Sequence, residues 1–235
     1  MRARIRIIDA GTRVKVVLPL ALAAAAFAAP STAQAATATC HGHRATIVGT
    51  NGANTIVGTS GRDVIVAKRG NDTIRARGGN DLICAGAGRD HVFGGKGSDT
   101  VFGGRGSDDI QGGDGADTVN AGEGNDDVQG DDGNDTILGD DGNDTLDGNN
   151  GDDVIEGGAG DDNEQGDEGS DELRGGSGSD ELHGGTGSDD LCGGRGDDDE
   201  QGDEGSDTIS DDQGNDVEDG GSGDDTVDGV DDNQQ

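Results

Sequence analysis

The stretch GGKGSDTVF-GGRGSDDIQ (94–111) contains one nine-residue pattern twice, and this pattern decides the fold. Counting in nines outward from it gives twenty consecutive nonapeptides, from Gly49 to Asp228, without insertion or deletion. Position 4 of the nonapeptide is Gly in all twenty units, and position 6 is Asp in nineteen. Position 8 is Ile, Val or Leu in seventeen, and position 1 is Gly in fifteen. A register held without a break from Gly49 to Asp228 indicates a repeat architecture rather than scattered low-complexity sequence.

The units fit the pattern G-G-x-G-x-D-x-U-x, in which U is a large apolar residue. This pattern resembles the nonapeptide of the RTX (repeats-in-toxin) family, and the resemblance covers residues 49–228. It implies an all-β fold, a parallel β-roll or β-helix solenoid, in which six residues form a turn and three form a short strand. Two nonapeptides would complete one coil. The resemblance also implies that calcium ions lie between turns stacked along each edge.

The residue types independently suit such a solenoid. An obligatory Gly marks a position with positive φ or with no room for a Cβ atom, and Asp supplies the hard oxygen ligand that calcium prefers. With two nonapeptides per coil, Asp99 and Asp117 would stack on one edge, and Asp108 and Asp126 on the other. Carboxylates on strands about 4.8 Å apart repel one another unless a divalent cation lies between them. We therefore expect the fold to form only with metal bound.

The position-6 aspartates of the sixteen regular units, which begin at residue 85, are the predicted calcium ligands. They are Asp90, Asp99, Asp108, Asp117, Asp126, Asp135, Asp144, Asp153, Asp162, Asp171, Asp180, Asp189, Asp198, Asp207, Asp216 and Asp225. Two rows of eight stacked turns would leave gaps for up to 14 calcium ions, or 18 if the four preceding units also bind.

The chain divides into four predicted segments. Residues 1–35 read as a secretory signal peptide, with basic residues before an apolar run and an Ala-Gln-Ala cleavage site at 33–35. The apolar run is shorter than the roughly 20 residues that a spanning helix needs. Residues 36–84 form an N-terminal cap of degenerate repeats, 85–228 the calcium-binding repeats, and 229–235 a C-terminal tail. We expect a secreted, extracellular protein that is not held in a membrane after cleavage.

The formal net charge of −35 is unevenly distributed. Residues 36–111 carry a net +2, whereas residues 112–235 carry a net −41. This charge argues against nucleic acid as a partner, because phosphate would be repelled. Only 28% of the chain is hydrophobic and 1% aromatic, so a metal-free chain is expected to be disordered. Calcium ions are the expected partners, and the sequence identifies no protein or surface partner.

Three cysteines follow the predicted signal peptide. Cys40 and Cys84 bracket the cap, and we predict a disulfide between them, with two thiols as the alternative. Cys192 would then be left over, at the outward-facing position 9 of its unit.

Three glutamates, Glu164, Glu200 and Glu218, occupy the normally apolar position 8. Their spacing places them on one sheet. A carboxylate facing the narrow core would have a raised pKa or would turn its strand outward. We expect local fraying of that sheet.

Together these features predict a secreted calcium-binding repeat protein that folds on binding calcium, has a structural or interaction role, and is not an enzyme. The alternative is a non-catalytic repeat portion or companion of a secreted enzyme or toxin, or a cell-surface adhesive component. Such arrays commonly follow an enzyme or pore-forming domain in the family that the chain resembles. Here only the segment 36–48 lies between the predicted signal peptide and the first regular nonapeptide.

Overall fold

The computed structural model describes residues 8–9, 38–210 and 213–228. The predicted signal peptide, apart from Ile8–Asp9, and the predicted C-terminal tail therefore lie outside the described residues. Within those residues, no helix is long and apolar enough to cross a membrane.

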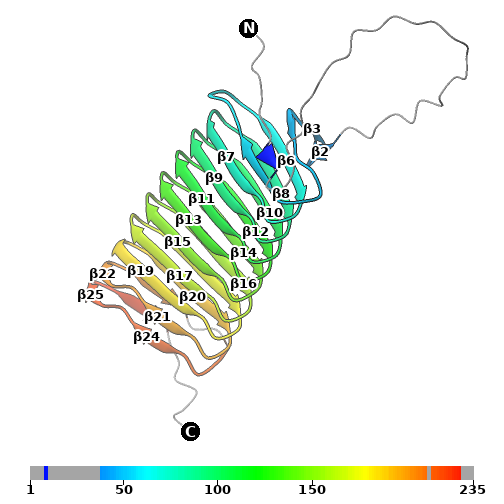
Figure 1. Ribbon diagram of the computed structural model, residues 1–235. Coiled ribbons are helices and arrows are strands. Elements are labelled where there is room, and N and C mark those ends of the chain that lie inside the picture. The colour runs from blue at the N-terminus through cyan, green and yellow to red at the C-terminus, as the bar shows by residue number, and fades with distance from the viewer. Residues whose placement is uncertain (1–7, 10–37, 211–212, 229–235) are drawn as a thin grey trace, which may run out of the picture.

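The chain forms a parallel β-solenoid, which confirms the predicted fold class. Each strand pairs in parallel with the strand two nonapeptides further on, as Val101 does with Val119 and Ile110 with Val128. Figure 1 shows the coils stacked along one axis, from the cyan coils near the cap to the red coils near the C-terminus. Consecutive nonapeptides alternate between two sheets, so each coil contributes one strand to each sheet.

The first sheet has 13 strands within the described residues. In stacking order they are β1 (Ile8–Asp9), β5 (Asn54–Val57), β7 (Thr73–Gly78), β9 (His91–Lys96), β11 (Asp109–Asp114), β13 (Asp127–Asp132), β15 (Thr145–Asn150), β17 (Asn163–Glu168), β19 (Glu181–Gly187), β21 (Asp199–Gln201) and β24 (Val217–Asp219), with β22 (Glu204–Gly205) and β25 (Ser222–Gly223) beside them. All pairs are parallel except β1 with β5, which is antiparallel.

The second sheet has 11 strands within the same residues. From the N-terminal end they are β4 (Ile47–Val48), β6 (Val64–Arg69), β8 (Leu82–Ala87), β10 (Thr100–Arg105), β12 (Thr118–Glu123), β14 (Thr136–Asp141), β16 (Val154–Ala159), β18 (Glu172–Ser177), β20 (Asp190–Arg195), β23 (Thr208–Ser210) and β26 (Thr226–Asp228). A separate hairpin consists of β2 (Thr39–Cys40) and β3 (His43–Arg44).

The strands from β6 to β20 are longer than the expected three residues, and this expectation was wrong. β10 runs from position 7 of one unit to position 3 of the next, so that only positions 4–6 turn. The register continues through Gly104↔Gly122. The reason is the positive φ at position 2, which is 112° at Gly104 and 75° at Asp131. Gly and Asp both tolerate this conformation, so the backbone bends while pairing with the adjacent coils continues.

The core is a narrow file of position-8 side chains between the two sheets. They are Ile47, Ile56, Ile65, Ile74, Ile83, Val92, Val101, Ile110, Val119, Val128, Ile137, Leu146, Ile155, Leu173, Leu182, Leu191 and Ile209. Position 1 faces the same core, and it is Gly or Ala in every unit except the one that begins at Asp211, which lies outside the described residues. A Cβ atom on Gly103 would lie 2.5 Å from the carbonyl oxygen of Ala121 in the next coil. The repeat thus fixes a small residue at position 1 through close contact between neighbouring coils.

The hairpin β2–β3 covers the outer face of the second sheet at its N-terminal end (Figure 1). Cys40 on β2 is fully buried and forms a disulfide with Cys84 on β8, with the two Cα atoms 5.7 Å apart. His41 stacks on Phe102 of β10, with ring centroids 3.7 Å apart. Apolar side chains beneath the hairpin form a second, small cluster around Cys40, and these are Val64, Val66, Leu82, Cys84 and Phe102. The hairpin is therefore tied to three successive coils.

Candidate calcium sites

The position-6 side chains form two ladders along the stack. Ladder I consists of Asn54, Asp72, Asp90, Asp108, Asp126, Asp144, Asp162, Asp180, Asp198 and Asp216. Ladder II consists of Asp63, Asp81, Asp99, Asp117, Asp135, Asp153, Asp171, Asp189, Asp207 and Asp225.

Each ladder is built by a repeated hydrogen bond between coils. In ladder II the backbone N–H of Asp99 donates to Oδ1 of Asp117 (2.6 Å), and that of Asp117 donates to Oδ1 of Asp135 (2.7 Å). In ladder I the N–H of Asp108 donates to Oδ1 of Asp126 (2.7 Å). The structure therefore brings together the aspartates that the period of two nonapeptides predicts to be stacked.

The second carboxylate oxygen of these side chains is buried without a hydrogen-bond donor. Within the described residues this holds for Oδ2 of every position-6 aspartate from Asp72 to Asp189. The side chains are also almost inaccessible, with Asp99 only 1% exposed and Asp117 only 2% exposed. A buried acceptor without a donor is costly, and a buried negative charge more so. A ladder of such atoms indicates that a cation belongs beside it.

Burial also changes the acidity of the ladder. Removal from water raises the pKa of Asp99 and of Asp135 to about 7. The backbone N–H of the preceding coil partly offsets this rise, and the neighbouring ladder carboxylates add to it. The pKa of Asp108 and of Asp144 rises to about 7 for the same reasons in ladder I. Without a cation, the ladders are stable only when many of these carboxyls hold a proton.

The backbone of the turns supplies a second set of oxygens. The position-4 glycine has a positive φ, 138° at Gly115 and 137° at Gly133, and its carbonyl group points toward the next turn of the same ladder. A Cβ atom on Gly133 would lie 2.0 Å from the carbonyl oxygen of Gly115. This close approach explains why position 4 is Gly from the second coil onward, whereas Gly52 and Gly61 in the first coil have no such contact. Carbonyl oxygens thus face the gaps between stacked turns.

The donor atoms along the ladders fit calcium. In the part of the chain that the structure describes, no three His, Cys, Asp or Glu side chains converge as a metal-binding group. Side chains alone therefore do not complete a site. Carboxylate and carbonyl oxygens together are the hard ligands that calcium takes in sets of six to eight, whereas zinc and copper favour nitrogen and sulfur. The position-6 carboxylates and the carbonyls of the turns would hold the ion.

The structure locates all sixteen predicted ligand residues on the two ladders, but not all of them equally deep. Those from Asp90 to Asp207 are buried, whereas Asp216 and Asp225 in the last coil are half-buried. Asp72 and Asp81 were not predicted as ligands, although their Oδ2 atoms are buried in the same way. Both have the sequence feature of a ligand, an Asp at position 6. Their units also have irregular residues at position 2, and these favoured assigning the units to the cap.

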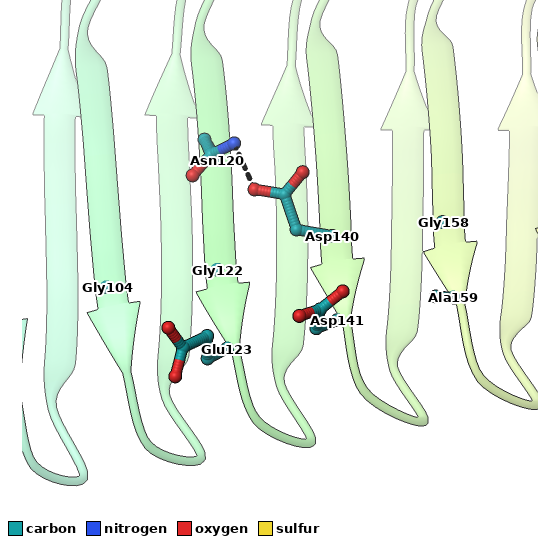
Figure 2. A pocket seen from close by; sticks show the side chains of 8 residues that line it. All are labelled: Gly104, Asn120, Gly122, Glu123, Asp140, Asp141, Gly158 and Ala159. Atoms are coloured by element: carbon teal, nitrogen blue, oxygen red, sulfur yellow. Dashed lines mark hydrogen bonds between the residues drawn. The ribbon is translucent and has the colours of Figure 1, made fainter.

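A second acidic surface lies outside the ladders, on the outer face of the second sheet (Figure 2). Asn120 on β12 donates from Nδ2 to Oδ2 of Asp140 on β14 at 2.5 Å, and Glu123 and Asp141 flank this pair. The floor of this pocket is backbone, because the surrounding strands carry Gly or Ala at the adjacent positions. Its carboxylates are partly or fully exposed, unlike the ladder residues, and the ladder geometry does not extend to them.

Glu164 and Glu200 lie in the core of the first sheet, on either side of Leu182. The expected fraying is wrong at Glu164, because β17 has its full six residues and Glu164 is fully buried. Burial raises its pKa well above the usual range, neighbouring Asp180 and Asp162 add to the rise, and the Gly157 backbone partly offsets it. Burial raises the pKa of Glu200 to about 7, although Oε1 accepts the backbone N–H of Gly193.

The strands of the first sheet are shorter toward its C-terminal end, where β21 and β24 have three residues each. Glu218 on β24 is half-buried. The opposite sheet keeps apolar residues at position 8 throughout, from Ile155 to Val227. Cys192 lies half-buried on β20 of that sheet, at position 9.

Replacing the buried carboxyl with an apolar side chain is expected to stabilise the protein. Both carboxyl oxygens of Glu164 are buried, and no side chain pairs with them within the described residues, so Glu164→Leu removes a buried polar group and extends the file of Leu146 and Leu182. A stabilisation on the order of 1–4 kcal/mol is expected, measured as a rise in Tm at saturating calcium. The matched control is Glu156→Leu, at an exposed position 9, which should change stability by less than about 0.5 kcal/mol. An unchanged or lower Tm for Glu164→Leu would contradict the placement of Glu164 in the core.

The raised pKa values predict that acid promotes folding of the metal-free chain. In the folded chain without metal, burial raises the pKa of Asp90 to about 6 and that of Asp99 and Asp135 to about 7, against 3.8 for the ordinary group. The folded state therefore binds more protons than the unfolded state between these values, so its stability is greatest below about pH 4 and falls as the pH rises through 7. In calcium-depleted buffer, the hydrodynamic radius should shrink between pH 7.5 and pH 5. An equal or larger radius at pH 5 would show that the ladders do not titrate in this way.

Comparison with protein-family models gives matches to the RTX calcium-binding nonapeptide repeat along the described solenoid. The matched residues are 48–83, 57–92, 85–110, 93–128, 129–163, 165–199 and 201–233. A comparison with curated proteins gives no match.

Proposed function

The chain belongs to the family of RTX calcium-binding nonapeptide repeats, and from this premise we propose that it is a secreted protein that folds into its solenoid on binding calcium. We propose a structural or interaction role rather than a catalytic one. The observation that carries the proposal is the pair of ladders, in which one carboxylate oxygen after another is buried without a donor.

Calcium binding and folding are the same event in this proposal. The gaps between turns exist only when coils are stacked, so the unfolded chain has no preformed site. Conversely, stacking without the ion places like charges in a buried row, as the raised pKa values of Asp99 and Asp135 indicate. Each ion therefore stabilises two adjacent coils at once.

Export is supported by the family and by the sequence of residues 1–35. RTX repeats are typical of secreted proteins, and residues 1–35 have the composition of a signal peptide. Calcium is abundant outside cells, where modules of this kind bind it with Kd values of about 10⁻⁴–10⁻³ M. The chain would then stay unfolded during export and fold after release.

A structural role is supported by the location of the functional side chains. The ladder aspartates are buried between coils, where they bind ions and hold the stack together but do not meet a substrate. The surface that remains is a long acidic solenoid, which suits display or spacing outside the cell. The net charge of −41 over residues 112–235 argues against nucleic acid as a ligand.

The proposal is tested by counting calcium ions bound per mature chain, using equilibrium dialysis at a few millimolar calcium. The ladders predict an upper bound of 14–18 ions, set by the gaps between position-6 aspartates. A count above about ten would support ladder binding. Binding of two ions or fewer would refute it, because so few ions could not neutralise both ladders. The same measurement with magnesium should give far fewer ions, since magnesium requires tight octahedral geometry and keeps its waters.

A further inference from the structure

Within the described residues, the first turn of each ladder differs from the turns that follow it in the backbone at position 2. β4 and β5 end at position 9, and residues 49–53 and 58–63 lie outside strands. Position 2 of these two units is Thr50 and Thr59, neither of which has a positive φ. In the next two units position 2 has the usual positive φ, 90° at Lys68 and 85° at Arg77. The two threonine turns thus have a geometry of their own.

Thr59 supplies hydrogen-bond donors to the carboxylate oxygen that has no donor in the later turns. Its backbone N–H donates to Oδ2 of Asp63 at 2.7 Å, and its hydroxyl lies 2.9 Å from the same oxygen. The hydroxyl also lies 2.9 Å from the carbonyl oxygen of Gly61 at position 4. One hydroxyl proton is thus shared between the carboxylate and the position-4 carbonyl, the two kinds of oxygen that face a gap in the later coils.

Thr50 repeats this arrangement at the start of ladder I. Its N–H and hydroxyl both lie 3.1 Å from Oδ1 of Asn54, and the hydroxyl lies 3.3 Å from the carbonyl oxygen of Gly52. Asn54 replaces the usual Asp by a neutral amide, and its Nδ2 donates to Oδ1 of Asp72 at 2.8 Å. This first rung therefore carries no charge that a metal ion must balance.

A fixed cation lies beside this rung. Lys68 follows Thr50 by one coil, and its Nζ donates to the carbonyl oxygen of Gly49 at 2.9 Å. This ammonium group, on an exposed side chain, links the first two coils. The Cys40–Cys84 disulfide and the apolar cluster under the hairpin add covalent and hydrophobic stabilisation that no later coil has within the described residues.

We infer that residues 38–84 fold without calcium and form the template on which the calcium-dependent coils assemble, from the N-terminal end to the C-terminal end. This inference rests on the proposed function, because a template has a purpose only if the later coils need calcium. In the template, threonine hydroxyls and the Lys68 ammonium replace the ion at the first rung of each ladder. Asp72 and Asp81, whose Oδ2 atoms lack a donor, are the rungs on which the first calcium-binding turns, those of Asp90 and Asp99, stack. Each later coil contacts only its neighbours, so the first calcium site is completed when the first new turn stacks on a turn that already exists.

Hydrogen exchange with mass spectrometry on the oxidised mature chain tests this directly. In calcium-free buffer with chelator, amides in residues 45–84 should be protected by at least about a hundredfold, while those in 112–225 exchange as in an unfolded chain. Calcium should protect both regions. Absence of protection in 45–84 without calcium would overturn the template. Protection of 112–225 without calcium would instead overturn the proposed function, so the two failures are distinguishable in one experiment.

Substitutions at position 2 test the role of the hydroxyls. The double variant T50V/T59V keeps side-chain shape but removes both hydroxyls, and protection of residues 45–84 without calcium should fall at least about tenfold. T50S/T59S keeps the hydroxyls and should retain most of the protection. The control T118V/T136V makes the same chemical change at position 7 of later coils, and it should leave the protection of residues 45–84 unchanged. Equal protection in T50V/T59V and the wild type, or equal loss in T50S/T59S and T50V/T59V, would overturn the assignment.

Discussion

Removal of calcium with excess chelator is expected to make residues 112–228 sensitive to a glutamate-specific protease within minutes, whereas the calcium-saturated chain should resist for hours. The informative bonds follow Glu164 and Glu200, which are 0% and 1% exposed in the folded chain. Cleavage at these bonds requires opening of the core, so it reports unfolding rather than nicking at the surface.

The physical reason is the small amount of apolar surface in each unit. The core receives about one side chain of Val, Leu or Ile size per nonapeptide, while all nine residues lose backbone freedom on folding. Over residues 112–235 the net charge of −41 adds repulsion in the compact state. Calcium offsets both costs, because it joins several oxygens and cancels charge in the same gap.

A matched measurement in magnesium completes this prediction. The chain in chelator with millimolar magnesium should be cut nearly as fast as the chain in chelator alone. Equal resistance of the calcium-free and calcium-saturated chains would contradict the account, because the fold would then be stable without the ion.

Asp117→Ala is expected to raise the calcium concentration at the folding midpoint at least about threefold and to unfold the neighbouring coils first. Asp117 lies in the middle of ladder II, between Asp99 and Asp135, so its loss affects two gaps. Far-UV circular dichroism during a calcium titration measures the midpoint.

Two control variants separate the possible causes of this rise in the calcium midpoint. Asp109→Ala removes a carboxylate from the outward position 7, where it contacts His91 at 2.9 Å on the surface, and should change stability by less than about 0.5 kcal/mol. Asp117→Asn keeps an oxygen that can accept the Asp99 N–H but removes the charge. If the carboxylate binds calcium, Asn should behave like Ala. If the side chain serves only as a backbone acceptor, Asn should behave like the wild type, which would contradict the metal role.

The sequence predicted the features that depend on the nine-residue period. The two sheets, the offset of two nonapeptides between paired strands and the two ladders follow from position alone, because a side chain at position 6 must meet its equivalent one coil away. The Cys40–Cys84 pair could also be anticipated, since both residues border the cap, and the structure joins them.

Strand length could not be predicted, because it depends on the backbone at position 2. The pattern treats Gly104 as part of a turn, whereas its positive φ lets the strand continue through it. The same position is where the cap departs from the pattern. Thr59 reads as a defect in the repeat, but its contacts to Asp63 and Gly61 depend on a local turn geometry that the letters do not reveal. The period likewise located Glu164 in the core but did not determine whether its strand would stay paired.

The most direct test of the central claim, that calcium binding and folding are one event, is a calcium titration of the mature chain followed by far-UV circular dichroism and hydrodynamic radius together. The account predicts an expanded, disordered chain in chelator and a cooperative transition near millimolar calcium, with both signals changing together. A compact, β-rich chain in excess chelator at neutral pH, or complete folding with magnesium alone at the same concentration, would contradict it.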